Sequence, residues 1–258
     1  PLLTVTSLPK VTSLPKVTPL PTVTPGSYAT ITVTDSRGIS VVFTEAPQRI
    51  VSLSPAHTEI FYALGLGDRV VGRDGYSDFP SEARLKPVVG DAFTLNLEAL
   101  VALKPDLVYT TFEGPVADIE RLGLKALYLF PAADVQGVLD NIILIGRIAD
   151  REERAEALVE EMESRIKAVT DRLAALGRGP RIYYEIDPGL WTVGPGSFVG
   201  DILKLLRVEN VAEGADSPFP QLSAEVIVQR NPEIVILGDS KEYLSTGIAV
   251  DDVKARPG

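Results

Sequence analysis

The chain has 258 residues, of which 45% are hydrophobic and 23% charged, so it can bury one large core or two smaller ones. Its formal net charge of −10 excludes the basic surface that binding to nucleic-acid backbones requires. Because it contains no cysteine and a single histidine, His57, the composition also excludes disulfides, thiolate catalysis and multi-histidine metal sites.

Residues 1–27 form a low-complexity segment rich in proline, threonine, leucine and valine, in which VTSLPK occurs at 5–10 and again at 11–16. Prolines at short intervals favour an extended polyproline conformation, so this segment is predicted to be a semi-rigid tether. A short strand packed against a partner is the alternative. No initiating methionine or signal-peptide pattern is present, and we interpret the chain as a fragment from which any targeting segment has been removed or left out.

Strands and helices are predicted to alternate over residues 28–148. Two β-rich runs at 30–35 and 39–45 flank a glycine-containing turn and predict a hairpin. The later segments follow a strand-then-helix order, with strands at 49–55, 69–73, 106–111 and 125–130 and helices at 57–67, 96–104 and around 115–122. This alternation is typical of a mainly parallel sheet.

Residues 149–176 contain neither glycine nor proline and carry apolar residues at helical spacing, which predicts one helix about 42 Å long. After it, strands at 181–187 and 233–238 alternate with helices at 200–206 and 223–230. We therefore predict an α/β protein with two Rossmann-like lobes joined by a long rigid helix. The expected boundaries are 28–148, 149–177 and 178–258, the last lobe being truncated.

The two lobes share a sequence repeat. NLEALVALKPDLVY at 96–109 aligns without a gap with SAEVIVQRNPEIVI at 223–236, which places Glu98 opposite Glu225. The strands beginning RIVSLSP at 49 and RIYYEIDP at 181 also correspond. A duplicated plan, or convergent use of one strand-helix plan, would place equivalent loops of both lobes around a shared cleft.

Aromatic residues collect at strand ends and just before the repeated helices. Each could be an ordinary core or loop-anchoring residue. Their comparable loop positions instead favour a cleft for a large, planar, partly apolar ligand. The residues are Tyr76, Phe93, Phe112, Trp191 and Phe219.

Several of these segments resemble the substrate-binding proteins of ABC importers for metal chelates, the class with a helical backbone between its lobes, and most closely its cobalamin-binding members. The resemblance covers roughly residues 30–250 and rests on 49–72, YSDFP at 76–80, 96–108, 197–203 and PFPQLSAE at 218–225. It implies two α/β lobes joined by a rigid helix, with a corrinoid such as cobalamin bound between them. An iron siderophore or haem is the alternative ligand.

The resemblance also implies roles for single residues. Tyr76, Trp191 and Phe219 match aromatic positions that line the corrin pocket, and Phe112 approximately matches a further one. The segment formed by Pro55, Ala56 and His57 matches the loop beneath the pocket. Where cobalamin binders carry a tryptophan, this chain has Ala92 beside Phe93, and the family continues beyond residue 258 with further pocket residues.

Glu98 and Glu225 match the surface glutamates that, in this family, dock on arginines of the two halves of a dimeric ABC permease. The alternative is that each simply interacts with the dipole of the helix in whose first turn it lies. A two-fold permease presents two equivalent basic sites, which favours docking.

Other chemistries find little support. His57 could be an axial ligand of a bound metal, or it could simply pack or hydrogen-bond locally in the first turn of a helix. No second-shell partner is apparent, and cobalamin binders have asparagine there, which favours the second interpretation. GPGSFVG at 194–200 lacks the spacing of a dinucleotide fingerprint and predicts a turn into a helix. A chelatase-like enzyme remains the less favoured alternative to a binding protein, and we expect neither catalytic residues nor a resident cofactor.

The resemblance finally implies a place in the cell. The protein is expected in the periplasm or on the outer face of the cell membrane, acting as a monomer with a small metal chelate and a permease as partners. Apolar runs such as 142–145 are far shorter than the about 20 residues that span a bilayer. Attachment to the membrane would therefore require a lipid anchor upstream of Pro1.

Overall fold

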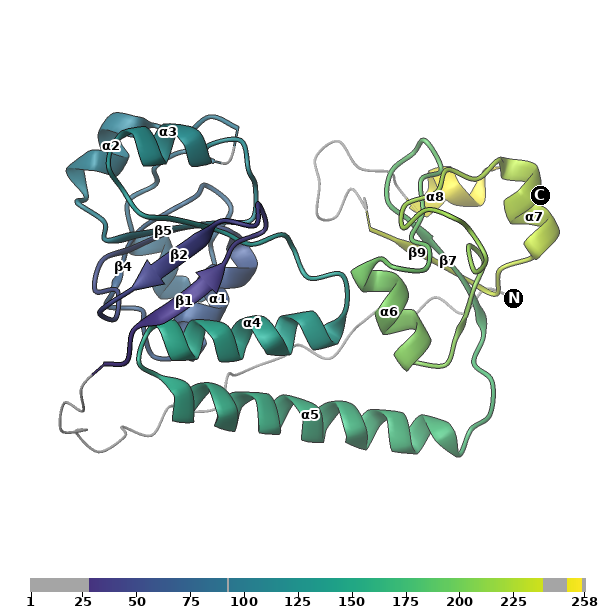
Figure 1. The fold of residues 1–258 in the computed structure, drawn as a ribbon. Helices are drawn as coiled ribbons and strands as arrows, with labels where there is room; N and C mark the ends of the chain where they lie inside the picture. Colours follow the sequence, from purple (N-terminus) through teal and green to yellow (C-terminus); the bar gives the residue numbers. More distant parts are fainter. Residues whose placement is uncertain (1–27, 92, 239–249, 257–258) are drawn as a thin grey trace. The chain divides into compact units, whose positions relative to one another are not determined.

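The structure is a computed structural model that describes residues 28–91, 93–238 and 250–256, so the predicted tether at 1–27 and Ala92 lie outside the described residues. The chain divides into two compact units (Figure 1). The N-terminal unit contains residues 28–132 and 136–163, and the C-terminal unit contains 133–135 and the described residues from 164 onward. Each unit is described by itself below.

The predicted hairpin is confirmed as the antiparallel pair β1 (Ile31–Thr34) and β2 (Ser40–Phe43). Gly38 closes its turn with φ of +79°, a conformation that glycine adopts without strain. The buried carboxylate of Asp35 accepts hydrogen bonds from the backbone N–H groups of Arg37 and Ile39, at 2.9 and 3.0 Å. The guanidinium of Arg37 also pairs with Glu120, so the hairpin is held to the rest of the N-terminal unit.

The main sheet of the N-terminal unit is parallel, as predicted, with strand order β4-β3-β5-β6. Every residue of β3 and β5 is buried, which explains why both strands are mostly apolar, with Ser52 and Thr110 as their buried polar residues. The strands are β3 (Ile50–Leu53), β4 (Val70–Arg73), β5 (Leu107–Thr110) and β6 (Ala126–Tyr128). The helices are α1 (Pro55–Ala63), the 3-10 helix η1 (Ser81–Leu85), α2 (Leu97–Ala102), α3 (Val116–Arg121) and α4 (Val135–Ile148).

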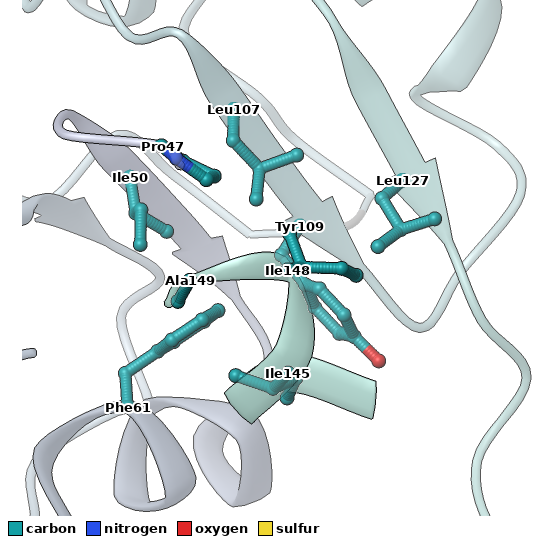
Figure 2. Close-up of a pocket in the computed structure, with 9 residues that line it drawn as sticks. All are labelled: Pro47, Ile50, Phe61, Leu107, Tyr109, Leu127, Ile145, Ile148 and Ala149. Atoms are coloured by element: carbon teal, nitrogen blue, oxygen red, sulfur yellow. The ribbon is translucent and has the colours of Figure 1, made fainter. Parts of the chain in front are cut away.

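The two faces of this sheet carry separate cores. Leu107 and Tyr109 of β5 pack with residues of α1 and α4, whereas Val108, between them, packs with residues of α2 and α3. The first face encloses a cavity of about 10 Å³. Figure 2 shows the apolar side chains that line it, among them Phe61 and Ile145. A cavity of this size holds one water at most, so it is a packing gap and not a ligand site.

The long helix begins later and ends earlier than predicted. The structure has α5 from Glu152 to Ala174, preceded by α4, a helix that the sequence analysis did not predict. Asp150, with φ of +56°, lies in the turn between them. A Cβ at Gly146 would lie 2.3 Å from Ala155 Cβ, so only glycine allows α4 to approach α5 this closely. The boundary between the two units falls within α5.

The C-terminal unit is built on a smaller parallel sheet with strand order β8-β7-β9. Its core gathers around Ile182, Val193 and Leu203. Its elements are β7 (Arg181–Glu185), α6 (Phe198–Leu205), β8 (Glu209–Asn210), α7 (Ala224–Arg230), β9 (Ile234–Leu237) and α8 (Val250–Lys254). Among the residues that the structure describes, no helix is both long and apolar enough to cross a membrane.

The sequence repeat has a structural counterpart at the start of the central strand in each unit. The N–H of Arg49, just before β3, donates to the carboxylate of Asp106 at 3.0 Å. The N–H of Arg181, which opens β7, donates to the carboxylate of Glu233 at 3.1 Å. Thus, in each copy of the repeat, the acidic residue that follows proline accepts a hydrogen bond from the equivalent backbone N–H of the neighbouring parallel strand.

Candidate functional site

The N-terminal unit exposes aromatic rings at the carboxyl edge of its sheet. Tyr76 follows β4 and is 73% exposed, and Phe112 follows β5 and is 43% exposed. Residues 88–90 continue the sheet through a parallel bridge between Arg73 and Val88, and Phe93 follows them with 80% of its surface exposed. The rings of Phe93 and Phe112 lie 4.7 Å apart. Because parallel strands end at one edge, these predicted ligand-binding residues share one side of the unit.

Two further exposed aromatic residues were missed by the sequence analysis. Phe79 lies in the same loop as Tyr76, and Phe130 comes shortly after the end of β6. The signal that identified Tyr76 and Phe112, an aromatic residue just beyond a strand, would also have identified Phe130. We call the exposed aromatic residues of this edge, listed here, the aromatic edge: Tyr76, Phe79, Phe93, Phe112 and Phe130.

The loop predicted to lie beneath the ligand is divided between surface and core. Pro55 and Ala56 open α1 and are exposed, whereas the imidazole of His57 is buried. Its Nδ1 lies 2.9 Å from Ser54 Oγ, its ring stacks on Tyr109, and its Nε2 is buried without a hydrogen-bond partner. The structure therefore does not support the hypothesis that His57 is an axial ligand, because the imidazole faces the core.

Burial lowers the pKa of His57 to about 4, because the core disfavours the charged imidazolium. Above pH 6.5 the histidine is neutral in both the folded and the unfolded chain, so it leaves the free energy of unfolding unchanged. As the pH falls from 6.5 to 4, the unfolded chain binds the proton more readily than the folded chain, which lowers the free energy of unfolding by up to about 3 kcal/mol. We expect His57→Gln to lose less stability than the wild type over this window. Urea unfolding at pH 7 and pH 4 measures the difference, and equal losses in both proteins would contradict the prediction.

In the C-terminal unit, Trp191 and Phe219 lie on two loops that are joined by backbone pairing. Trp191 is 41% exposed and Phe219 is 53% exposed. The N–H groups of Thr192 and Gly194 donate to the carbonyl oxygens of Pro220 and Pro218, at 2.9 and 2.8 Å. The pairing holds both predicted ligand-binding residues on one structured surface. That this surface and the aromatic edge face a shared cleft stays a prediction.

The segment at 194–200 is a turn into a helix, as predicted. Ser197 is buried and caps α6, since its Oγ accepts a hydrogen bond from the N–H of Gly200 at 3.1 Å and donates to the carbonyl of Gly194 at 2.7 Å. Phe198 opens the helix and is 38% exposed, a position that the sequence analysis did not select.

Glu98 and Glu225 occupy equivalent positions in the first turns of α2 and α7. The side chains of Asn96 and Ser223 cap these helices, accepting hydrogen bonds from the N–H groups three residues later at 3.0 and 3.3 Å. Both glutamates are exposed. Hydrogen bonds from its own backbone N–H and from Ser223 lower the pKa of Glu225. Each unit thus presents one exposed carboxylate at a helix N-terminus.

No metal centre is evident in the described part of the chain, where no three or more His, Asp or Glu side chains gather closely enough to hold an ion. The chemistry that both units do offer is that of exposed aromatic faces. Such faces bind planar, partly apolar groups by stacking and by exclusion of water.

The sequence is similar to a known protein family and to curated relatives. Residues 50–258 match the profile of a family described as periplasmic binding protein. An uncharacterized ABC transporter substrate-binding lipoprotein of Bacillus subtilis is 30% identical over 219 residues, which cover 81% of this chain and 69% of that one. A cobalamin-binding protein of Halobacterium salinarum is 31% identical over 222 residues, which cover 83% of this chain but only 60% of that one. The chain therefore spans less than two thirds of the halobacterial relative.

Solved structures show the same likeness. A possible iron-binding, periplasmic solute-binding protein of Staphylococcus epidermidis matches with a TM-score of 0.72 and 28% identity, covering 83% of this chain and 84% of that one. The periplasmic vitamin B12 binding protein of Vibrio cholerae matches with a TM-score of 0.66 and 26% identity, covering 81% of this chain and 82% of that one. These structures are two-lobed binding proteins, and their fold agrees with the α/β architecture described above.

Proposed function

The chain belongs to the periplasmic binding protein family, and from this premise we propose that it is the solute-binding component of an ABC importer that captures a corrinoid and delivers it to a permease. The observation that carries the proposal is the aromatic edge of the N-terminal unit. Its rings are exposed at the edge of the sheet where ligands of open parallel sheets bind. The cobalamin-binding and vitamin B12-binding relatives support the choice of ligand.

A corrin ring suits such a surface because it is broad, flat and largely apolar on its faces. Large exposed apolar patches are uncommon on soluble proteins and mark binding sites. Stacking a planar ligand on exposed rings removes apolar area from water on both partners, which is the main source of affinity in pockets of this kind.

A second candidate ligand is haem or another iron chelate. It is favoured by the structural likeness to the possible iron-binding protein of Staphylococcus epidermidis and by the planar shape that haem shares with a corrin. In either case the protein binds and releases its ligand unchanged, as a solute-binding protein does. We place it outside the cytoplasmic membrane, as its lipoprotein and periplasmic relatives are named, and propose that it acts as a monomer.

Delivery requires contact with a permease, and we propose Glu98 and Glu225 for this role. Both are exposed and lie at equivalent positions, one on each unit. A permease with two-fold symmetry presents the same basic site twice, so a protein with two equivalent carboxylates can engage both halves.

Titration with cyanocobalamin, haemin and a ferric hydroxamate tests the ligand, with the fluorescence of Trp191, the only tryptophan, as the signal. We expect saturable quenching by cyanocobalamin at one ligand per chain, and about tenfold weaker binding by Tyr76→Ala because a stacking face is lost. Leu122→Ala is the matched control, since Leu122 is 42% exposed but lies after α3, toward the amino edge of the sheet. Saturation by haemin alone would favour the second candidate, and no saturation by any of the three would overturn the proposal.

A further inference from the structure

The exposed aromatic residues share a backbone feature that their side chains do not reveal. At four of them, the residue's own N–H donates a hydrogen bond to a side-chain oxygen two positions earlier in the chain. The donor–acceptor pairs are Tyr76 with Asp74 at 2.6 Å, Phe93 with Asp91 at 2.8 Å, Phe112 with Thr110 at 3.1 Å and Phe219 with Ser217 at 3.2 Å. The same backbone-to-side-chain hydrogen bond therefore occurs on loops of both units.

Asp74 is the most deeply anchored of these acceptors. It is 2% exposed, although the Tyr76 ring that follows it is 73% exposed. Its Oδ1 accepts hydrogen bonds from the N–H groups of Tyr76 and Ser77, and its Oδ2 accepts one from the Ser77 hydroxyl at 2.8 Å. A buried carboxylate is costly unless it is hydrogen-bonded, so these three contacts strongly favour one conformation of the loop.

The anchoring continues into the core of the N-terminal unit. Thr58 Oγ1 lies 2.9 Å from the hydroxyl oxygens of both Ser77 and Ser52, and all three side chains are buried. Ser52 belongs to β3 and Thr58 to α1. The N–H of Asp74 also donates to the carbonyl of Ser52 at 3.0 Å. A connected polar network therefore links the backbone of Tyr76 to the central strand of the sheet.

A neighbouring carboxylate in the same loop provides a contrast. The Asp78 side chain is 64% exposed, and the contact that the structure gives it is an ion pair with Arg84 at 3.4 Å. It accepts no hydrogen bond from the backbone of an aromatic residue among the described contacts. Two acidic side chains four positions apart thus differ in whether they hold the loop that carries Tyr76.

We propose that Asp74 is a positioning residue, which holds the ring of Tyr76 in place for the ligand, and that the oxygen two positions before each of the other three aromatic residues acts in the same way. The proposal rests on the ligand-binding role proposed above. A ring that is already held in its binding orientation loses less conformational entropy when the ligand arrives, so affinity increases without any new contact. Asp74 itself need not touch the ligand.

The first test needs no ligand. Amide hydrogen exchange, followed residue by residue in the free protein, should be at least about tenfold faster at Tyr76 and Ser77 in Asp74→Ala than in the wild type. The amide of Val89, which donates to the carbonyl of Arg73, reports on the rest of the sheet and should change little. Unchanged exchange at Tyr76 and Ser77 would overturn the proposal, as would equal acceleration at Val89, which would mean general destabilisation.

The second test is a double-mutant cycle with cyanocobalamin as the probe. Asp74→Ala should weaken binding about five- to tenfold in the wild-type background and by less than about twofold in Tyr76→Ala, because its effect passes through that ring. Asp74→Asn keeps a carbonyl acceptor for both N–H groups and should restore most of the affinity. Asp78→Ala is the matched control and should bind as the wild type does.

Equal losses from Asp74→Ala in both backgrounds would overturn the positioning role. If the wild type binds no cyanocobalamin, haemin is used as the probe in the same cycle. Failure of the wild type to bind either one would overturn the proposed function, and the exchange experiment would then decide by itself whether Asp74 holds Tyr76.

Discussion

Replacing Arg256 by methionine is expected to lower the free energy of unfolding by about 3 kcal/mol or more, because it leaves a buried carboxylate without its cation. Glu185 ends β7 and is 0% exposed. Both of its oxygens accept hydrogen bonds from the guanidinium of Arg256, at 2.5 and 2.8 Å. Two parallel hydrogen bonds of this kind are the strongest arrangement that an arginine and a carboxylate can form.

Urea unfolding followed by the fluorescence of Trp191, which lies in the same unit, measures this effect. Arg178→Met is the matched control, since Arg178 pairs with Glu209 at 3.0 Å but its side chain is 70% exposed, and it should cost no more than about 1 kcal/mol. Adding Glu185→Gln to Arg256→Met should recover a large part of the loss because no buried charge remains. A loss in Arg256→Met no larger than that in Arg178→Met would show that the pair of Arg256 with the buried Glu185 contributes little.

Combining Glu98→Ala with Glu225→Ala is expected to abolish most corrinoid uptake while leaving affinity for cyanocobalamin within about twofold of the wild type. Neither carboxylate belongs to the aromatic surfaces, and each side chain is exposed at a helix N-terminus. An exposed first-turn glutamate contributes little to the stability of the fold, because water screens its interaction with the helix dipole. The large effect should therefore appear in transport and not in folding or binding.

Uptake of labelled cyanocobalamin by cells that express each variant as their only copy measures the effect on transport. The two single variants should each be impaired to a similar degree, because the sites are equivalent. Glu156→Ala with Glu160→Ala, two exposed glutamates on α5, is the matched control for lost negative charge. Normal uptake by the double variant, or a parallel loss of ligand binding, would refute the docking role.

Much of the fold could be predicted from local patterns. The strands β3 to β7 and β9 were each recognised from apolar runs beside turn residues, and the hairpin from alternation around Gly38. Helix α4 was missed although Leu139, Ile142 and Ile145 repeat at helical intervals. Its glycines reduce intrinsic helix propensity, and Gly146 is needed only because Ala155 packs against it, a contact that no local pattern reveals.

Part of the candidate site could be predicted from the sequence. Residues just beyond strand ends were recognised as exposed aromatics, since parallel strands bring such loops to one edge. The sequence left open whether His57 binds a metal or packs locally, because a residue at the start of a helix can face either the surface or the core. Its stacking on Tyr109, more than fifty positions away in the chain, decides that it faces the core.

The amino-acid sequence by itself determined most of the order of strands and helices, the parallel α/β class, the repeat and the loops that carry aromatic residues. These depend on periodicity and turn chemistry within short stretches of chain. Only the tertiary structure decided which side chains are exposed and which polar groups they bind. Asp74 and Asp78 are the same residue type in one loop, yet one is buried beneath Tyr76 and the other faces water. Burial depends on segments that are distant in sequence, and packing of β3 and α1 against that loop makes the difference.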